Sequence, residues 1–169
     1  MQLISTRFSP ELLDAEDFSR CAVEPVRGVA KRQTEYLAGR LCAREALMRL
    51  TGISATPACG EDRAPQWPLG MVGSITHGSG WAGAVVGNST DWRGLGLDIE
   101  QIMPASRAER LAAEILTPSE LFRLETLPNE QRAQRISLIF SLKESLFKAL
   151  YPQVLQHFYF QDAQRRRRQ

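Results

Sequence analysis

Two carboxylates lie one residue apart at the end of the apolar stretch GLGLDIE, residues 94–100: Asp98 and Glu100. In a strand, residues i and i+2 point to the same face, so the two carboxylates would share one side while the apolar residues between them fill the other. Two adjacent like charges each resist ionisation, and a divalent cation is one group that would relieve their repulsion. A solvated strand edge, or a cap for the next element, is an equally good interpretation of this pattern alone.

A second group of polar residues follows one side of the apolar segment RISLIFSLKESLFKALYP. At about 100° per residue, its leucines, isoleucine and phenylalanine cover well over half of the helix circumference, which predicts a largely buried helix. The remaining stripe is narrow, and a surface ion pair between residues four apart is its simplest interpretation. Serines beside one carboxylate favour instead a stripe that faces a cleft or another polar group. The stripe consists of Ser137, Ser141, Glu144 and Lys148.

A third pattern is the segment RAPQWPLGMVGSITHGSG, in which a stiff loop leads to a strand and a glycine turn. The strand delivers Ser74, Thr76 and His77 to that turn, where hydroxyls, an imidazole and backbone N–H groups could hold phosphate. Taken alone, the segment is better explained as a hairpin with an incidental histidine.

Together the three patterns supply the parts of a phosphate-transfer site, in which carboxylates hold Mg²⁺ and cationic side chains neutralise phosphate oxygens. Arg32 and Arg40 fall on one side of the expected helix 29–50, eight residues apart. A guanidinium group binds phosphate through two parallel hydrogen bonds, so both arginines suit a multiply phosphorylated substrate. The three cysteines form no C-x-x-C pair and the chain has only two histidines, so any metal is expected to have oxygen ligands.

The elements that must position these residues can be assigned coarsely. A helix is expected over residues 29–50 and ends at a glycine, and three strand-like segments, 71–76, 81–87 and 93–100, suggest an antiparallel meander. The sequence TPSE at 117–120 has the pattern of a capping box, and a longer helix is expected from about 129 to 151, ended by Pro152. This order predicts an α/β protein of the α+β type.

The composition is that of a soluble globular chain: 169 residues, 43% hydrophobic and 24% charged. No apolar run approaches the roughly 18 residues of a membrane span, and the N-terminus is acidic where a signal peptide is basic, so a cytoplasmic protein without membrane contact is expected. The net charge of +2 falls to −2 without the arginines at 165–168. This basic tail, residues 161–169, is expected to be disordered, with nucleic-acid binding as the less favoured alternative.

GLGLDIE and, some forty residues later, FSLKESLFKAL resemble the two signatures of the 4′-phosphopantetheinyl transferases. The segments EYLAGRLCAREAL and RAPQWPLGMVGSITH are similar to the subgroup typified by the enterobactin synthetase component. The resemblance covers residues 20 to 152. It implies transfer of 4′-phosphopantetheine from coenzyme A to a serine of an acyl or peptidyl carrier protein, as in siderophore, polyketide or fatty acid biosynthesis, with release of 3′,5′-ADP.

The resemblance also assigns roles to the residues of the three patterns. It implies Mg²⁺, or Mn²⁺ in its place, and coenzyme A as substrate. Glu144 would also help to deprotonate the carrier serine, and Lys148 would steady the pyrophosphate and the leaving group. The metal ligands would be Asp98, Glu100 and Glu144, and the residues that hold coenzyme A would be Arg32, Arg40, Arg63, Thr76, His77, Asp98 and Lys148.

The implied fold has two similar α/β lobes related by a pseudo-twofold axis, with the active site between them. Residues 1–100 would form the N-terminal lobe and 101–160 a mostly helical C-terminal lobe. In the family, some fifty further residues complete the second lobe, whereas this sequence ends soon after FYFQDAQ. The second lobe is therefore expected to lack most of its sheet, and the helix that carries Glu144 to expose apolar surface.

Two other functions fit parts of the sequence. One is a non-catalytic remnant of the family that binds coenzyme A or a carrier protein without turnover. The other is a nucleic-acid-binding module built on the arginine tail and the basic helix. The second is disfavoured because the chain without its tail is acidic and shows no alternation of aromatic and basic residues.

Overall fold

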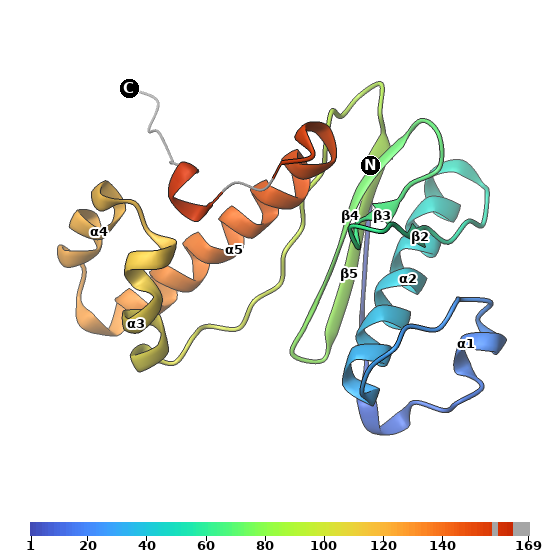
Figure 1. The fold of residues 1–169 in the computed structure, drawn as a ribbon, viewed down its shortest axis with the longest axis horizontal. Helices are drawn as coiled ribbons and strands as arrows, with labels where there is room; N and C mark the ends of the chain where they lie inside the picture. The colour runs from blue at the N-terminus through green and yellow to red at the C-terminus, as the bar shows by residue number, and fades with distance from the viewer. Residues whose placement is uncertain (157–158, 164–169) are drawn as a thin grey trace.

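The computed structural model describes residues 1–156 and 159–163. The molecule has two parts, joined by an extended connection over residues 89–104 (Figure 1). One part holds the sheet and the long helix α2, and the other consists of helices. In the described part of the chain, no helix is both long enough and apolar enough to cross a bilayer.

The main sheet is antiparallel and has the strand order β1-β5-β4. The hairpin of β4 (Met71–Gly78) and β5 (Trp81–Asn88) confirms two of the expected strands, and Met71 lies opposite Asn88. The third expected strand, 93–100, is wrong, because this segment is extended but pairs with no strand in the described chain. The free edge of β5 is instead taken by the N-terminal strand β1 (Gln2–Arg7), whose apolar positions Leu3 and Ile4 gave too short a pattern to predict it.

Helix α2 (Ala30–Thr51) packs on one face of this sheet, as Figure 1 shows, and it confirms the helix expected over 29–50. Small side chains allow the helix to approach closely, since a Cβ atom on Gly39 would lie 2.7 Å from Cγ2 of Ile75. The helix ends at Gly52, whose φ of 75° is the left-handed conformation of a C-terminal glycine. A buried core of alanines and cysteine fills the contact with the sheet: Ala38, Cys42, Ala43, Ala82 and Ala84.

The opposite face of the sheet is covered by the extended segment 94–99. Its side chains alternate, so that Leu97 and Ile99 lie over Gly83 of β5. Gly94 and Gly96 face the other way, toward α5 (Asn129–Val154), and a Cβ atom on Gly96 would collide with the carbonyl of Ser145. The GLGL sequence therefore lets a helix backbone lie directly on the segment, which explains why no further strand pairs there.

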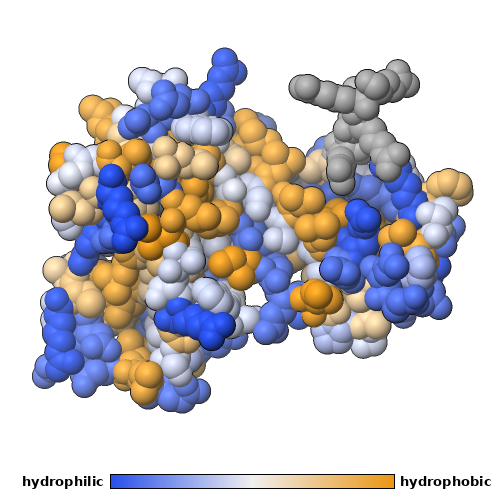
Figure 2. Space-filling view, turned by 180° about the vertical axis from the view of Figure 1, so that it is seen from behind, coloured by the Kyte–Doolittle hydropathy of each residue, from blue (hydrophilic) through white to orange (hydrophobic). Residues whose placement is uncertain are grey.

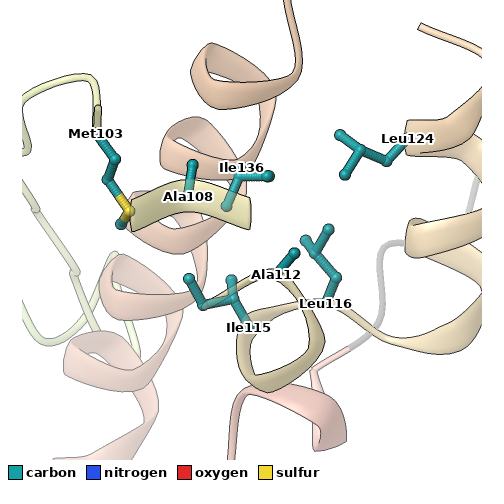
Figure 3. Close-up of a cluster of buried hydrophobic side chains, with 7 residues drawn as sticks. All are labelled: Met103, Ala108, Ala112, Ile115, Leu116, Leu124 and Ile136. Atoms are coloured by element: carbon teal, nitrogen blue, oxygen red, sulfur yellow. The ribbon is translucent and has the colours of Figure 1, made fainter. Parts of the chain in front are cut away.

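The helical part is built from α3 (Ala105–Ile115), α4 (Pro118–Glu125) and α5. Figure 3 shows its core, in which apolar side chains of the three helices point toward one another. The expected capping box is confirmed: Thr117 accepts from the backbone N–H of Glu120, and Glu120 accepts from that of Thr117. The core consists of Met103, Ala108, Ala112, Ile115, Leu116, Leu124 and Ile136.

Helix α5 differs from prediction in two ways. It continues through Pro152 to Val154, because a proline near a helix end removes only one of the few hydrogen bonds left there. It is also not largely buried: every exposed residue between positions 138 and 150 is a leucine. This confirms the expected exposure of apolar surface, and Figure 2 shows hydrophobic surface reaching from the sheet part onto the helical part. The exposed leucines are Leu138, Leu142, Leu146 and Leu150.

Short elements complete the described chain. Helix α1 (Asp17–Arg20) follows a 3-10 turn at Pro10–Leu12, and a second 3-10 turn lies at Phe160–Asp162. Strands β2 (Ala58–Cys59) and β3 (Pro65–Gln66) form a small hairpin. Most of the tail expected to be disordered, residues 164–169, lies outside the described residues.

Candidate active site

The ammonium group of Lys148 connects all three patterns found in the sequence. From α5, its Nζ donates to Oδ1 of Asp98 at 2.7 Å and to the carbonyl of Leu97 at 3.2 Å. It also lies 3.5 Å from Oγ1 of Thr76 on β4. Thr76 and Asp98, which precede Lys148 by 72 and 50 positions in the chain, therefore meet at its ammonium group. Lys148 and Ser141 of the polar stripe thus contact the acidic segment, whereas Ser137 accepts a hydrogen bond from the backbone N–H of Met103.

Thr76 and Gly78 fix the acidic segment against β4. The hydroxyl of Thr76, a side chain that is almost fully buried, accepts a hydrogen bond from the backbone N–H of Ile99 at 3.0 Å. At Gly78 a Cβ atom would lie 3.0 Å from the carbonyl of Ile99, so the two backbones touch. Asp98, the residue before Ile99, is thereby held next to β4.

Asp98 is the most buried carboxylate of the candidate site, with a side chain only 5% exposed. Lys148 satisfies one of its oxygens, but the other, Oδ2, is buried and has no hydrogen-bond partner among the described residues. A buried carboxylate oxygen without a donor is costly. Ser141, from the same stripe, donates to the backbone carbonyl of Asp98 at 3.5 Å and not to this oxygen.

The other two candidate carboxylates lie near enough for their charges to act on Asp98 and on one another. Burial raises the pKa of Glu144 above its ordinary value, and the negative charge of Asp98 raises it further against the opposing effect of Lys148. Burial likewise raises the pKa of Glu100, and the charges of Asp98 and Glu144 add to the rise. The charges of Lys148 and Arg107 oppose this rise. The three carboxylates are thus electrostatically coupled to one another and to nearby cations.

These carboxylates offer hard oxygen donors, which suit a divalent cation such as Mg²⁺. The unpartnered Oδ2 of Asp98 and the mutual repulsion of Glu100 and Glu144 are both features that a cation would relieve. In the described part of the chain, however, no three His, Cys, Asp or Glu side chains are gathered as a ready metal site. The donor set therefore fits the ion, and its side chains would have to converge on it.

His77 lies next to this group at the end of β4. Burial lowers the pKa of its imidazole; the charges of Arg32 and Lys148 lower it further, while those of Glu35 and Asp98 oppose the change. Its Nδ1 is 3.5 Å from Oε2 of Glu35 on α2. The patterns in the sequence did not single out Glu35, although its position three residues after Arg32 placed it on the same side of the helix.

The three arginines expected to bind phosphate differ in their surroundings. Arg32 is exposed on the side of α2 that faces His77. Arg40 is buried, only 4% exposed, with its guanidinium 4.7 Å from the ring of Tyr36 and its Nε without a partner in the described chain. Arg63 is exposed in the turn between β2 and β3, where its φ is 69°.

The turn that carries Arg63 lies near the C-terminal end of α5. Burial raises the pKa of Tyr151, and the charge of Asp62 and a hydrogen bond between the two side chains raise it further. Tyr151 is three residues beyond Lys148 on α5, so this turn is close to the end of the candidate site. A contact between Asp62 and Tyr151 could not be read from the sequence, because neither belongs to a periodic pattern.

A cleft of about 530 Å³ opens beside the carboxylates. Its walls are the acidic segment and the N-terminal half of α5, and its polar lining includes Asp98, Glu100, Gln131, Arg135 and Ser141. The candidate site therefore has a concave space large enough for a small-molecule group next to its charged residues.

Two family models match this chain. The model described as the 4′-phosphopantetheinyl transferase N-terminal domain matches residues 23–87, and that of the 4′-phosphopantetheinyl transferase superfamily matches residues 94–169. The boundary between the matches falls at the start of GLGLDIE.

Several curated proteins are similar in sequence. Enterobactin synthase component D of Escherichia coli K12 is 43% identical over 119 residues, which cover 70% of this chain and 55% of that protein. The 4′-phosphopantetheinyl transferase PptT of Mycobacterium tuberculosis is 37% identical over 141 residues, 81% of this chain and 59% of that protein. The 4′-phosphopantetheinyl transferase Npt of Nocardia iowensis is 33% identical over 159 residues, 92% of this chain and 70% of that protein. The chain spans about half the length of the first of these relatives.

Proposed function

We propose, since this chain belongs to the 4′-phosphopantetheinyl transferase superfamily, that it transfers 4′-phosphopantetheine from coenzyme A to a serine of an acyl or peptidyl carrier protein. The observation that carries the proposal is the meeting of Lys148 with Asp98 and Thr76. It brings the helix, the acidic segment and strand β4 to one point, beside a cleft.

In the proposed reaction, the serine oxygen attacks the phosphorus that carries the pantetheine group. A P–O bond forms there while the bond to the phosphate of 3′,5′-ADP breaks, and the serine proton passes to Glu144, directly or through water. Glu144 suits this role because burial and the nearby Asp98 raise its pKa, which makes its carboxylate a better base than an ordinary glutamate.

Cationic and hydrogen-bonding groups would position the substrate. Lys148 would offer its ammonium to the pyrophosphate, and Thr76 and His77 would contribute a hydroxyl and an imidazole from the same strand end. Arg32 is accessible to a phosphate group. Arg40 would reach a ligand only if its guanidinium left the ring of Tyr36, and Arg63 would approach from the turn near the end of α5.

A divalent cation, when bound by Asp98, Glu100 and Glu144, would neutralise the pyrophosphate charge that develops during transfer. The support for these ligands is their oxygen donors, the unpartnered Oδ2 of Asp98 and the repulsion between the three carboxylates. We propose Mg²⁺, with Mn²⁺ as the alternative of the same chemistry.

The test is mass spectrometry of apo acyl and peptidyl carrier proteins after incubation with the protein, coenzyme A and Mg²⁺. A gain of one phosphopantetheine group is expected, and it should disappear with a chelator or in Glu144→Gln. The matched control is Glu45→Gln, which removes an exposed carboxylate that pairs with Arg49 on the surface of α2. A gain that persists in Glu144→Gln would refute the role given to that residue.

The uncovered face of α5 favours a second candidate, a protein that binds coenzyme A without transferring its phosphopantetheine. Four half-exposed leucines follow the helix that carries Glu144 and Lys148, so this helix lacks packing on one side. Calorimetric titration with coenzyme A separates the candidates, because binding without any mass gain on carrier proteins would favour the second.

A further inference from the structure

Glu35 occupies a position that the proposed chemistry has not yet used. It lies on α2, and its side chain is only 12% exposed although the helix begins at the molecular surface. A carboxylate that is this buried is normally paired. One neighbour is Lys31, whose Nζ is 4.0 Å from one carboxylate oxygen and whose side chain is 72% exposed. The other is His77, whose Nδ1 is 3.5 Å from the second carboxylate oxygen.

The imidazole has two distinct nitrogens, and the partner of one decides the state of the other. With Nδ1 3.5 Å from Oε2 of Glu35, the favourable arrangement is a proton on Nδ1, which then faces the carboxylate. Nε2, at the far side of the ring, makes no hydrogen bond within the part of the chain that the structure describes. Glu35 thus leaves one nitrogen of the ring for a ligand.

We propose that Glu35 is a positioning residue, which holds His77 with Nδ1–H toward α2 and thereby directs Nε2 to a phosphate group of the bound substrate. The same carboxylate offsets the positive charge when His77 takes up a proton in contact with phosphate, so that Nε2–H becomes a charge-assisted donor. The contact between Nε2 and a substrate phosphate rests on the proposed function, whereas the orientation of the ring by Glu35 does not.

The other charged groups around His77 cannot replace Glu35. Arg32 on α2 and Lys148 on α5 are cations, which disfavour protonation of the imidazole. Asp98 is the other anion that acts on His77, but its Oδ1 is already bonded to Lys148 at 2.7 Å. Among the groups that act on this imidazole, Glu35 is therefore the carboxylate available to it.

The test uses the tautomer of His77, measured by long-range ¹H–¹⁵N NMR correlation at a pH where the ring is neutral. The chain has only two histidines, so a His157→Gln background leaves a single imidazole signal. Wild type should show the Nδ1–H tautomer, Glu35→Ala should move the population toward Nε2–H, and Glu35→Gln, which keeps the shape of the side chain, should give a mixture. An unchanged tautomer in both variants would overturn the proposal.

Two controls exclude a general effect of changing α2. Glu45→Ala removes a carboxylate of the same helix that pairs with exposed Arg49, and Lys31→Gln removes the other neighbour of Glu35. Neither should change the tautomer of His77. A change of the same size in Lys31→Gln would mean that helix electrostatics, and not the contact with Glu35, orients the ring.

Coenzyme A binding then tests the contact between His77 and the substrate phosphate separately. Calorimetry should show about tenfold weaker binding in Glu35→Gln, the loss expected for one weakened charge-assisted hydrogen bond, with a rise in KM and little change in kcat. If the tautomer changes but binding does not, His77 is oriented by Glu35 and does not contact the ligand. If wild type binds no coenzyme A, the proposed function fails while the orientation of the ring stands.

Discussion

The buried ion pair between Lys143 and Glu120 allows a quantitative test of how α5 is held. Both side chains are 6% exposed, and Nζ of Lys143 donates to Glu120 at 2.7 Å and to the carbonyl of Ile115 at 2.8 Å. Lys143 thus joins α5 to the start of α4 and to the end of α3. Because Glu144 is the next residue, this pair also sets the rotation at which α5 presents its polar stripe to Asp98.

We expect Lys143→Met to be strongly destabilising at neutral pH. The substitution keeps most of the side-chain volume but leaves the carboxylate of Glu120 buried without its cation, a change that costs about 3–5 kcal/mol. For a chain of this size, that corresponds to a fall in Tm of roughly 6–20 °C. Urea unfolding followed by circular dichroism at 222 nm measures the free energy directly.

The pH dependence gives the sharper test. Burial acts to raise the pKa of Glu120, but hydrogen bonds from Lys143 and from the backbone of Thr117, with the charge of Lys143, outweigh burial and hold that pKa below 4.5. The stability that the pair supplies is therefore complete above pH 4.5 and is lost as the pH falls through the lower, folded-state pKa. Without Lys143, only the hydrogen bonds with Thr117 oppose the effect of burial. We therefore expect Glu120 to take up a proton at higher pH in the variant, so that the cost of the substitution shrinks as the pH falls.

The difference in unfolding free energy between wild type and Lys143→Met should therefore decrease from pH 7.5 to pH 5. The double variant Glu120→Gln/Lys143→Met should recover part of the loss at pH 7.5, because it leaves no unpaired buried charge. A loss that is equal at both pH values, with no recovery in the double variant, would refute this account and point to lost packing instead.

Three further predictions concern the segment and helix that form the candidate site. Gly96→Ala should destabilise the protein and weaken coenzyme A binding, because its Cβ would collide with the carbonyl of Ser145. The control is Gly52→Ala, at a helix end with no neighbour within 4 Å, where the strain of the left-handed backbone alone should lower Tm without changing binding. Glu144→Gln should raise the Tm of the ligand-free protein at pH 7, since a carboxylate with a raised folded-state pKa opposes folding at neutral pH, and this gain should vanish near pH 4; an unchanged Tm would contradict the raised pKa that burial and Asp98 give to Glu144. Leu142→Ala, at a half-exposed position, should cost less than half as much unfolding free energy as Ile136→Ala, which removes a fully buried side chain of the same helix at about 2–5 kcal/mol; equal costs would mean that the leucine row is covered in solution.

Sequence patterns predicted where helices and strands lie in the chain better than they predicted which elements pack or pair with one another. The capping box at Thr117 and the glycine at the end of α2 are local signals, and the structure confirms both. The apolar alternation of GLGLDIE was equally clear but led to a wrong strand, because period-2 patterning states which side chains are buried and not whether the backbone pairs. Here the buried side chains meet the sheet face, and the glycines between them meet a helix.

The candidate site shows the same limit at the level of single residues. Spacing within one helix placed Glu144 and Lys148 on one stripe, and the contact of Lys148 with Asp98 places that stripe against the acidic segment. Glu35 was missed because its significance comes from His77, forty-two positions away, and only the packing of α2 on β4 brings them together. Arg40 carried a phosphate-binding pattern, yet the fold buries it against Tyr36.

The two lysines of the KESLFK sequence show how one helix separates structural support from chemistry. They are five residues apart, so at about 100° per residue they point roughly 140° away from each other around α5. Lys143 faces α3 and α4, where its buried ammonium donates short hydrogen bonds to the carboxylate of Glu120 and the carbonyl of Ile115. Lys148 faces the sheet with a side chain 28% exposed, and its single carboxylate partner keeps one oxygen unsatisfied. A phosphate that entered the site could therefore bind Lys148, and a cation could bind Asp98, in place of their contact with each other. Breaking the pair of Lys143 and Glu120 in the same way would leave an unpaired buried charge and destabilise the packing of α5 on α3 and α4.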